Sequence, residues 1–221
     1  MNQRPGSEQV ALSRQLRHAE KHLKIADPRL AKWIVECGRC QLTVAWDRSL
    51  YEALVRAIAH QQLHGRAAES ILQRLVVAFA KSGHEFPTPR QLSRARPERI
   101  KSCGFSTAKV LAIQGIAAAA ARGELPNRAE AFALSDAELV ERLLPLRGVG
   151  KWTVEMLLIF TLGRLDVMPV DDFGIRSGLQ HLFDLTAHPK KSEFAGLTDH
   201  WAPYRTVGAW YLWRLADARK S

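Results

Sequence analysis

Residues 143–153 read Leu143-Leu-Pro-Leu-Arg-Gly-Val-Gly-Lys-Trp-Thr153, and this stretch decides the fold. An apolar helical pattern precedes it and another follows it, so it predicts two helices joined by a tight Gly-x-Gly hairpin. Gly148 and Gly150 can adopt positive φ and let a phosphate approach the backbone. The second helix presents free N–H groups and the positive end of its dipole to such an anion. We therefore expect a phosphate-binding hairpin.

The hairpin offers further candidate contacts to a phosphate. Lys151 adds a positive charge, Thr153 adds a hydroxyl, and Val149 is expected to anchor the loop in the core. The same glycines would also serve an ordinary corner between two helices that binds nothing. Gly-x-Gly alone is therefore weak evidence, and other segments must decide.

Two adjacent carboxylates follow further along the chain. Asp171 and Asp172 come after Pro169-Val170 and precede a helical run. One of them is expected to cap that helix, a role that needs no catalysis, and the residues alone do not choose between them. A fixed anion that follows a phosphate-binding hairpin suggests an enzyme that works on a nucleotide inside DNA.

Composition limits the classes of partner. The chain has 221 residues, a formal net charge of +10 and a sequence pI near 9.9. This length suits one large domain or two small intertwined ones, and the charge favours a polyanionic partner through counterion release. No apolar run approaches the ~20 residues of a membrane span, and the N-terminus lacks the apolar segment of a secretory signal. An intracellular protein without a membrane partner is expected.

The cysteines predict no metal centre. There are three, Cys37, Cys40 and Cys103, and an odd number argues against a disulfide framework. Cys37-Gly-Arg-Cys40 has the spacing of half a metal site, but no second Cys or His pair completes it, so ordinary thiols are expected. The C-terminal region has no cysteine, which excludes a four-Cys iron–sulfur cluster there.

Helical periodicity dominates the chain, and strand signals are few, Gln41–Ala45 being a short extended candidate. Ser135 and Glu138 form a capping box that begins one helix. The other expected helices are Leu50–Leu63, Ala67–Ala80, Thr107–Arg122, Lys151–Leu162, Phe173–Phe183 and Tyr204–Ala218. The fold class is all-α with about ten helices.

Three segments together resemble the helix-hairpin-helix DNA glycosylases. Within this superfamily, the segments most resemble 3-methyladenine DNA glycosylase II, the alkylation-repair branch. They are the hairpin at 146–153, Met168-Pro-Val-Asp-Asp-Phe-Gly-Ile-Arg176 as the catalytic-aspartate segment, and Ala53-Leu-Val-Arg-Ala-Ile-Ala-His-Gln-Gln-Leu63 with Ala67-Ala68 as the first core helix and DNA-wedging turn. The resemblance implies two helical subdomains that flank an active-site cleft: residues 1–46 with 165–221, and a central subdomain of residues 47–164.

The resemblance implies an activity in base excision repair. It assigns Asp172 as the catalytic carboxylate, with Asp171 as a structural partner. In lyase-competent relatives a lysine stands two positions after the second hairpin glycine, and here that position is Trp152. The implied enzyme is a monofunctional glycosylase that hydrolyses the N-glycosidic bond of alkylated, 3-methyladenine-type bases in duplex DNA.

The resemblance also names binding residues. Gln62 is the wedge that fills the gap left by the flipped base, His64 can reach the minor groove, and Gln61 is structural. An aromatic pocket suits an electron-poor alkylated base, since stacking contributes about 1–3 kcal/mol per base. The pocket residues are Trp152, Met156, Phe173 and Trp213, and the DNA-binding residues are Gln62, His64, Gly148, Val149, Gly150, Lys151 and Thr153.

No cofactor is required by this chemistry, and the expected partner is damaged double-stranded DNA, bound by a monomer. By resemblance, the carbonyls of Leu144, Leu146 and Val149 can hold a structural Na⁺ or K⁺. Three alternatives stay open: a non-catalytic helix-hairpin-helix DNA-binding module, a bifunctional glycosylase/AP lyase, and a thiol enzyme that uses Cys37 and Cys40. The sequence does not rank the damaged bases.

Overall fold

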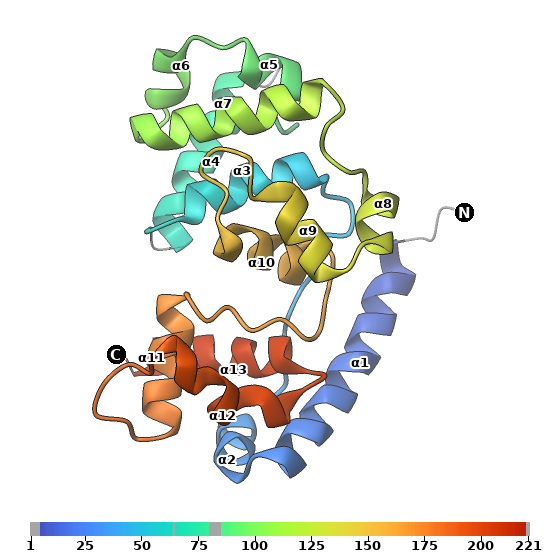
Figure 1. The fold of residues 1–221 in the computed structure, drawn as a ribbon, viewed down its shortest axis with the longest axis vertical. Coiled ribbons are helices and arrows are strands. Elements are labelled where there is room, and N and C mark those ends of the chain that lie inside the picture. Colours follow the sequence, from blue (N-terminus) through green and yellow to red (C-terminus); the bar gives the residue numbers. More distant parts are fainter. Residues whose placement is uncertain (1–4, 64, 80–84, 220–221) are drawn as a thin grey trace. The chain divides into compact units, whose positions relative to one another are not determined.

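A computed structural model describes residues 5–63, 65–79 and 85–219, and every regular element within these ranges is a helix (Figure 1). The all-α prediction is confirmed. The candidate strand Gln41–Ala45 forms no strand; instead, the N–H of Ala45 donates to the carbonyl of Phe160 at 2.9 Å. None of the helices in these ranges is long and apolar enough to cross a membrane.

The elements follow one another in the order α1 Pro5–Ala26, α2 Pro28–Cys37, α3 Leu50–His60, α4 Gly65–Phe79, α5 Pro89–Ser93, α6 Pro97–Lys101, α7 Thr107–Ala121, α8 Arg128–Ala133, α9 Asp136–Leu143, α10 Lys151–Phe160, α11 Phe173–Leu182, η1 Lys191–Glu193, α12 Phe194–Thr198, η2 Asp199–Trp201 and α13 Arg205–Ala218. The expected helix over Ala67–Ala80 corresponds to α4, and Ala80 itself lies outside the described residues.

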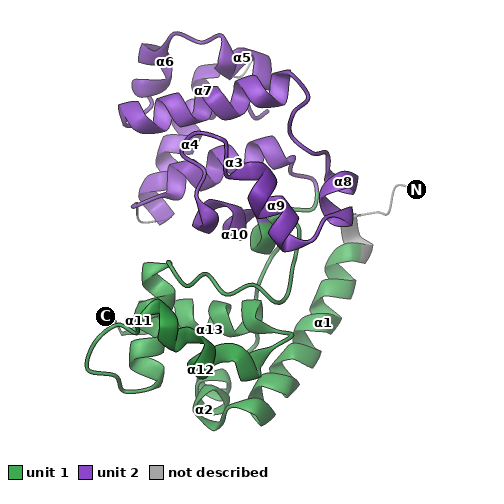
Figure 2. Cartoon of the chain, viewed as in Figure 1, with its two compact units in different colours: residues 1–46, 158–221 green, residues 47–157 purple. Residues whose placement is uncertain are grey.

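The chain divides into two compact units (Figure 2): unit 1 comprises residues 1–46 and 158–221, and unit 2 comprises residues 47–157. The resemblance places residues 158–164 in the central subdomain, and here the structure differs. They belong to unit 1, because Phe160 accepts the backbone hydrogen bond of Ala45 and because Gly163 lies against the Trp46 ring. A Cβ at Gly163 would come within 2.8 Å of that ring.

Capped helices and an apolar core build unit 2. Ser49 accepts the N–H of Glu52 at the start of α3, and Ser135 forms the predicted capping box with Glu138 at the start of α9. α3 packs against α4 and α7, and α7 also packs against α5. Fully buried side chains fill these contacts, each contributing roughly 1.5–3 kcal/mol relative to exposure; they include Leu54, Ile58, Leu75, Ile113 and Ile116.

In unit 1, α11 packs closely on α13. A Cβ at Gly178 would lie 2.4 Å from the carbonyl oxygen of Leu212, so only glycine allows this approach. α2 is fixed at its start by Asp27, whose Oδ1 accepts the N–H groups of Arg29 and Leu30.

The second oxygen of Asp27 fixes a distant segment of unit 1. Asp27 Oδ2 lies 3.1 Å from the indole nitrogen of Trp201 and 3.2 Å from His200 Nε2. Burial alone would raise the pKa of Asp27, but the hydrogen bonds from Leu30, His200, Trp201 and Arg29 together bring it below its ordinary 3.8. The ionised carboxylate therefore stabilises the folded state at neutral pH.

Candidate active site and DNA-binding elements

The Gly-x-Gly hairpin joins α9 to α10 in unit 2. Gly148 has φ +77°, and a Cβ there would lie 2.6 Å from the Cβ of Ala112, so this position requires glycine. Gly150 differs from the expectation, since its φ is not in the left-handed region. A Cβ at Gly150 would meet nothing within 4 Å. The first glycine thus lets the hairpin pack on α7, and the second leaves its outer face open beside the start of α10.

The residues around these glycines take different roles. Val149 is 6% exposed and its N–H donates to the carbonyl of Leu146, so it anchors the loop. Lys151 is exposed, and its Nζ lies 3.6 Å from Glu155 Oε1. Thr153 is 1% exposed, and its hydroxyl accepts a hydrogen bond from Gln61. This corrects the expected DNA contact of the Thr153 hydroxyl, because the group supports the hairpin from inside.

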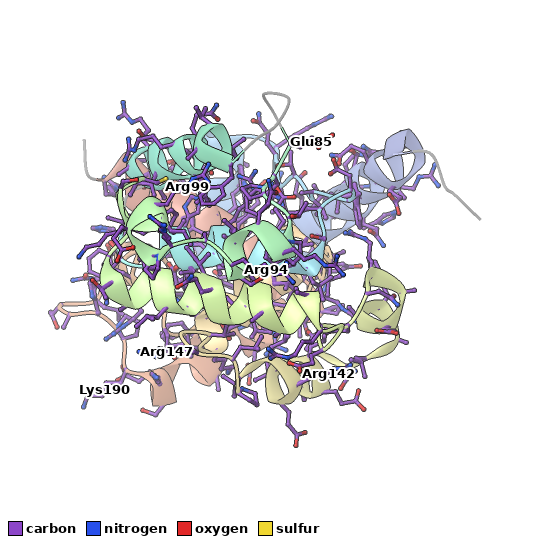
Figure 3. The ribbon with its side chains drawn as sticks, turned by 90° about the horizontal axis from the view of Figure 1, so that it is seen from above. Glu85, Arg94, Arg99, Arg142, Arg147 and Lys190 are labelled. Carbon is purple, nitrogen blue, oxygen red and sulfur yellow. The ribbon has the colours of Figure 1, made fainter. Side chains whose placement is uncertain are left out.

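Exposed arginine side chains lie on several elements of unit 2. Figure 3 labels four exposed examples: Arg94 after α5, Arg99 in α6, Arg142 in α9 and Arg147 in the hairpin. Their charges add to the attraction that unit 2 exerts on a polyanion.

The predicted wedge lies in the turn after α3. α3 ends at His60, earlier than the expected Leu63, because Gln61 leaves the helical conformation and Gln62 has φ +56°. The Gln62 side chain is exposed. A left-handed conformation is uncommon for a residue other than glycine and occurs often at functional sites. His64, the predicted minor-groove contact, lies outside the described residues.

Gln61 joins the wedge turn to the hairpin. Its amide nitrogen lies 3.0 Å from the carbonyl oxygen of Gly148 and 2.9 Å from the hydroxyl of Thr153. The sequence analysis gave Gln61 a structural role, but no local pattern indicated these partners, because they lie far along the chain.

Lys109 of α7 is a contact that the sequence analysis missed. Its ammonium donates to the carbonyl oxygens of Ala59 at 2.9 Å and Gln61 at 2.7 Å. Partial burial lowers the pKa of this lysine. The surrounding alanine-rich helix gives no signal of such a role, so only the packing of α7 on α3 reveals it.

The two adjacent aspartates of unit 1 have different partners. Asp172 is the N-cap of α11, and its Oδ1 accepts the N–H of Ile175 at 3.0 Å and the indole N–H of Trp213 at 2.9 Å. Asp171 is exposed and forms an ion pair with Lys191. Two donors thus fix the Asp172 carboxylate at a helix N-terminus, where the helix dipole stabilises negative charge.

The predicted pocket aromatics divide between the units. In unit 1, Trp213 contacts Asp172 directly, and its ring stacks on Phe160 with centroids 5.7 Å apart. The resemblance predicts a stacking role for Trp213 and does not predict its hydrogen bond to Asp172. Phe173 is 66% exposed, and its ring packs edge-on against His188.

Two predicted pocket residues lie in unit 2. Trp152 and Met156 both stand on α10, and each side chain is half-buried.

The cysteines lack the properties of nucleophiles. Burial raises the pKa of the Cys37 thiol, and it raises that of Cys40 to about 12. A thiol is reactive as its thiolate, so both groups are poor nucleophiles at neutral pH. Within the described ranges, no three His, Cys, Asp or Glu side chains gather to hold a metal ion. The structure therefore gives no support to the thiol-enzyme alternative.

Comparison with known proteins gives consistent matches over most of the chain. The chain is 41% identical over 209 residues to DNA-3-methyladenine glycosylase 1 of Schizosaccharomyces pombe, covering 93% of this chain and 91% of the relative. It is 38% identical over 199 residues to the alkylbase DNA glycosidase-like protein mag2 of the same organism, covering 90% and 93%.

A solved structure also matches the fold. The S. pombe 3-methyladenine DNA glycosylase Mag1 in complex with abasic DNA superimposes with a TM-score of 0.84 at 41% identity, covering 89% of this chain and 95% of that one. A family model for HhH-GPD superfamily base excision DNA repair proteins matches residues 55–203, which include the wedge turn, the hairpin and Asp172. The chain therefore belongs to the HhH-GPD superfamily of base excision DNA repair proteins.

Proposed function

We propose that the protein is a monofunctional DNA glycosylase that excises alkylated bases of the 3-methyladenine type from duplex DNA. The observation that carries this proposal is the Asp172 carboxylate, fixed by two N–H donors at the N-terminus of α11 in a chain of this superfamily. The names of the similar proteins from S. pombe support the choice of alkylated bases. The proposed substrate is DNA, so the proposed place of action is inside the cell.

The chemistry begins with cleavage of the bond between C1′ and the base nitrogen. The electron pair of this bond leaves with the base, and a base made cationic by alkylation leaves as a neutral molecule. No general acid is then needed. The sugar becomes positively charged, and a water molecule adds to C1′ and gives up a proton, for which the Asp172 carboxylate is an acceptor.

The main contribution of Asp172 is electrostatic. A carboxylate about 4 Å from the cationic sugar, at an effective dielectric near 20, attracts it by about 4 kcal/mol. If this attraction develops only in the transition state, it corresponds to a rate increase of about a thousandfold. The donors from Ile175 and Trp213 hold the carboxylate before the reaction, so little reorganisation is needed during it.

Excision without strand cleavage follows from the residue at the lyase position. A glycosylase/AP lyase uses an amine to form a Schiff base with the sugar, and Trp152 has no amine to offer. The neighbouring Lys151 lies near Glu155 and is exposed beside the hairpin, which suits a phosphate contact. Treatment with borohydride should therefore trap no covalent enzyme–DNA adduct.

DNA binding is assigned to the hairpin and the wedge turn. The open face at Gly150, the first N–H groups of α10 and Lys151 bind a backbone phosphate. Gln62 enters the duplex in place of the flipped base. Trp213, whose indole N–H donates to Asp172, is the proposed stacking partner of the flipped base, and the protein acts as a monomer.

A monovalent cation on the hairpin is a further part of the proposal. Its ligands would be the carbonyls of Leu144, Leu146 and Val149. The Leu146 carbonyl accepts the N–H of Val149 at 3.0 Å, which leaves it a second lone pair for a cation. Replacing Na⁺ and K⁺ with a bulky organic cation at equal ionic strength should weaken DNA binding.

A base-release assay tests the proposal. Duplexes that carry 3-methyladenine, 7-methylguanine, ethenoadenine, hypoxanthine or 1-methyladenine are incubated with excess enzyme, and the free base is quantified. Release of alkylated bases without strand cleavage is expected. Binding without release of any base would instead support a non-catalytic DNA-binding module.

A further inference from the structure

We infer that Lys109 is a positioning residue for the DNA wedge, an inference that rests on the proposed function. Its ammonium donates to the carbonyl oxygens of Ala59 and Gln61, and both of these residues lie close before Gln62. Lys109 thereby holds the wedge turn in the conformation that presents Gln62 to the duplex.

α3 ends at His60, directly before the wedge turn. The last carbonyl groups of a helix have no partner within the helix, and they carry its negative dipole end. A lysine is well suited to this place, because one ammonium supplies several donors and a positive charge. Lys109 approaches from α7, which packs on α3, and is only partly exposed.

The Gln61 carbonyl belongs to the peptide group that precedes Gln62. The orientation of this peptide plane depends on ψ of Gln61, which is 125°, and on φ of Gln62, which is +56°. A left-handed conformation is unfavourable for a residue with a side chain. The charged hydrogen bond from Lys109 at 2.7 Å offsets this cost and restricts the rotation of the plane.

The Gln61 side chain gives the same turn a second attachment. It binds the Gly148 carbonyl and the Thr153 hydroxyl, so the turn is held by α7 through its backbone and by the hairpin through a side chain. The wedge turn is therefore ordered before DNA binds. Without Lys109, the turn would have to be ordered at the moment of insertion, and base flipping would become less favourable.

The test compares two duplexes with four variants. In one duplex the damaged base is paired; in the other it lies opposite an abasic-site analogue, where less work is needed to flip it. These four single variants are Lys109→Met, Lys109→Arg, Gln62→Ala and the exposed control Lys21→Met on α1, and the double variant Lys109→Met/Gln62→Ala is measured alongside them. Single-turnover excision is measured on both duplexes, and thermal unfolding is measured for each variant.

We expect Lys109→Met to lose about tenfold in rate on the paired duplex and less than about threefold on the other. Gln62→Ala should show the same contrast, and the double variant should lose little more than either single one, because both changes act on one wedge. Lys109→Arg should keep most of the activity, and Lys21→Met should match the wild type. If Lys109→Met does not fold, Lys109→Gln replaces it in the same comparison.

A second measurement needs no excision. The wild-type chain should raise the fluorescence of 2-aminopurine placed beside an abasic analogue, because wedge insertion unstacks it, and Lys109→Met should reduce this rise at saturating protein. Equal losses on both duplexes, full additivity with Gln62→Ala, or an unchanged fluorescence rise would each overturn the inference. The fluorescence is read without base release. Failure of the inference about Lys109 can therefore be distinguished from failure of the proposed glycosylase activity.

Discussion

The two hairpin glycines should respond in opposite ways to the same substitution. In Gly148→Ala, the alanine would have to keep φ +77°, and its methyl group would lie 2.6 Å from the Cβ of Ala112. The left-handed conformation costs roughly 1–2 kcal/mol and overpacking roughly 1–3 kcal/mol more. A destabilisation of about 2–5 kcal/mol corresponds to a fall in Tm of about 4–20 °C for a chain of this length.

Gly150→Ala is the matched variant. Its methyl group would meet nothing within 4 Å, and its φ is acceptable for alanine, so Tm should stay the same or rise slightly. The methyl group would, however, occupy the face that the phosphate approaches. We expect the affinity for abasic duplex DNA to fall about tenfold, a loss of about 1.4 kcal/mol.

Thermal unfolding by circular dichroism and fluorescence anisotropy at fixed salt measure the two effects. Wild-type affinity in Gly150→Ala would refute the phosphate contact, and an unchanged Tm in Gly148→Ala would refute the packing argument.

Three further substitutions test the supporting contacts. Trp213→Phe keeps the ring but removes the N–H that fixes Asp172, so single-turnover excision should fall about tenfold, and wild-type rates would contradict this role. Gln61→Leu leaves the buried Thr153 hydroxyl without its donor, so urea unfolding should show a loss of about 1–3 kcal/mol; no loss would exclude the link. Asp27→Asn should destabilise the chain by about 1–3 kcal/mol at neutral pH. Because the folded pKa of Asp27 is lowered, the wild type loses this extra stability as the pH falls below 3.8. A stability difference between the wild type and Asp27→Asn that does not change with pH would contradict this role of the carboxylate.

The sequence predicted the helices where local signals are strong. The capping box of Ser135 and Glu138 is present as expected, because its hydrogen bonds join residues three apart. The end of α3 was predicted too late, since Leu63 continues the apolar pattern while a tertiary contact from Lys109 stabilises the turn before it. Periodicity reports which face is buried and does not report such distant donors.

The candidate site was predictable to a similar extent. The resemblance proposed Asp172, but the residues alone left Asp171 equally eligible. The structure separates them because Asp172 receives donors from Ile175 and from Trp213, the latter 41 positions away. Thr153 was assigned to the surface because its hydroxyl follows the glycines, yet helical geometry turns it inward toward Gln61. Side-chain direction at a helix start depends on details that spacing does not give.

Base excision is assigned to the Asp172 carboxylate. The most direct test is single-turnover release of an alkylated base from duplex DNA by the wild type and by Asp172→Asn, with affinity for abasic DNA measured alongside. The amide of Asn can still cap α11, so folding and binding should persist while the excision rate falls about a thousandfold. Excision at the wild-type rate by Asp172→Asn would contradict the account.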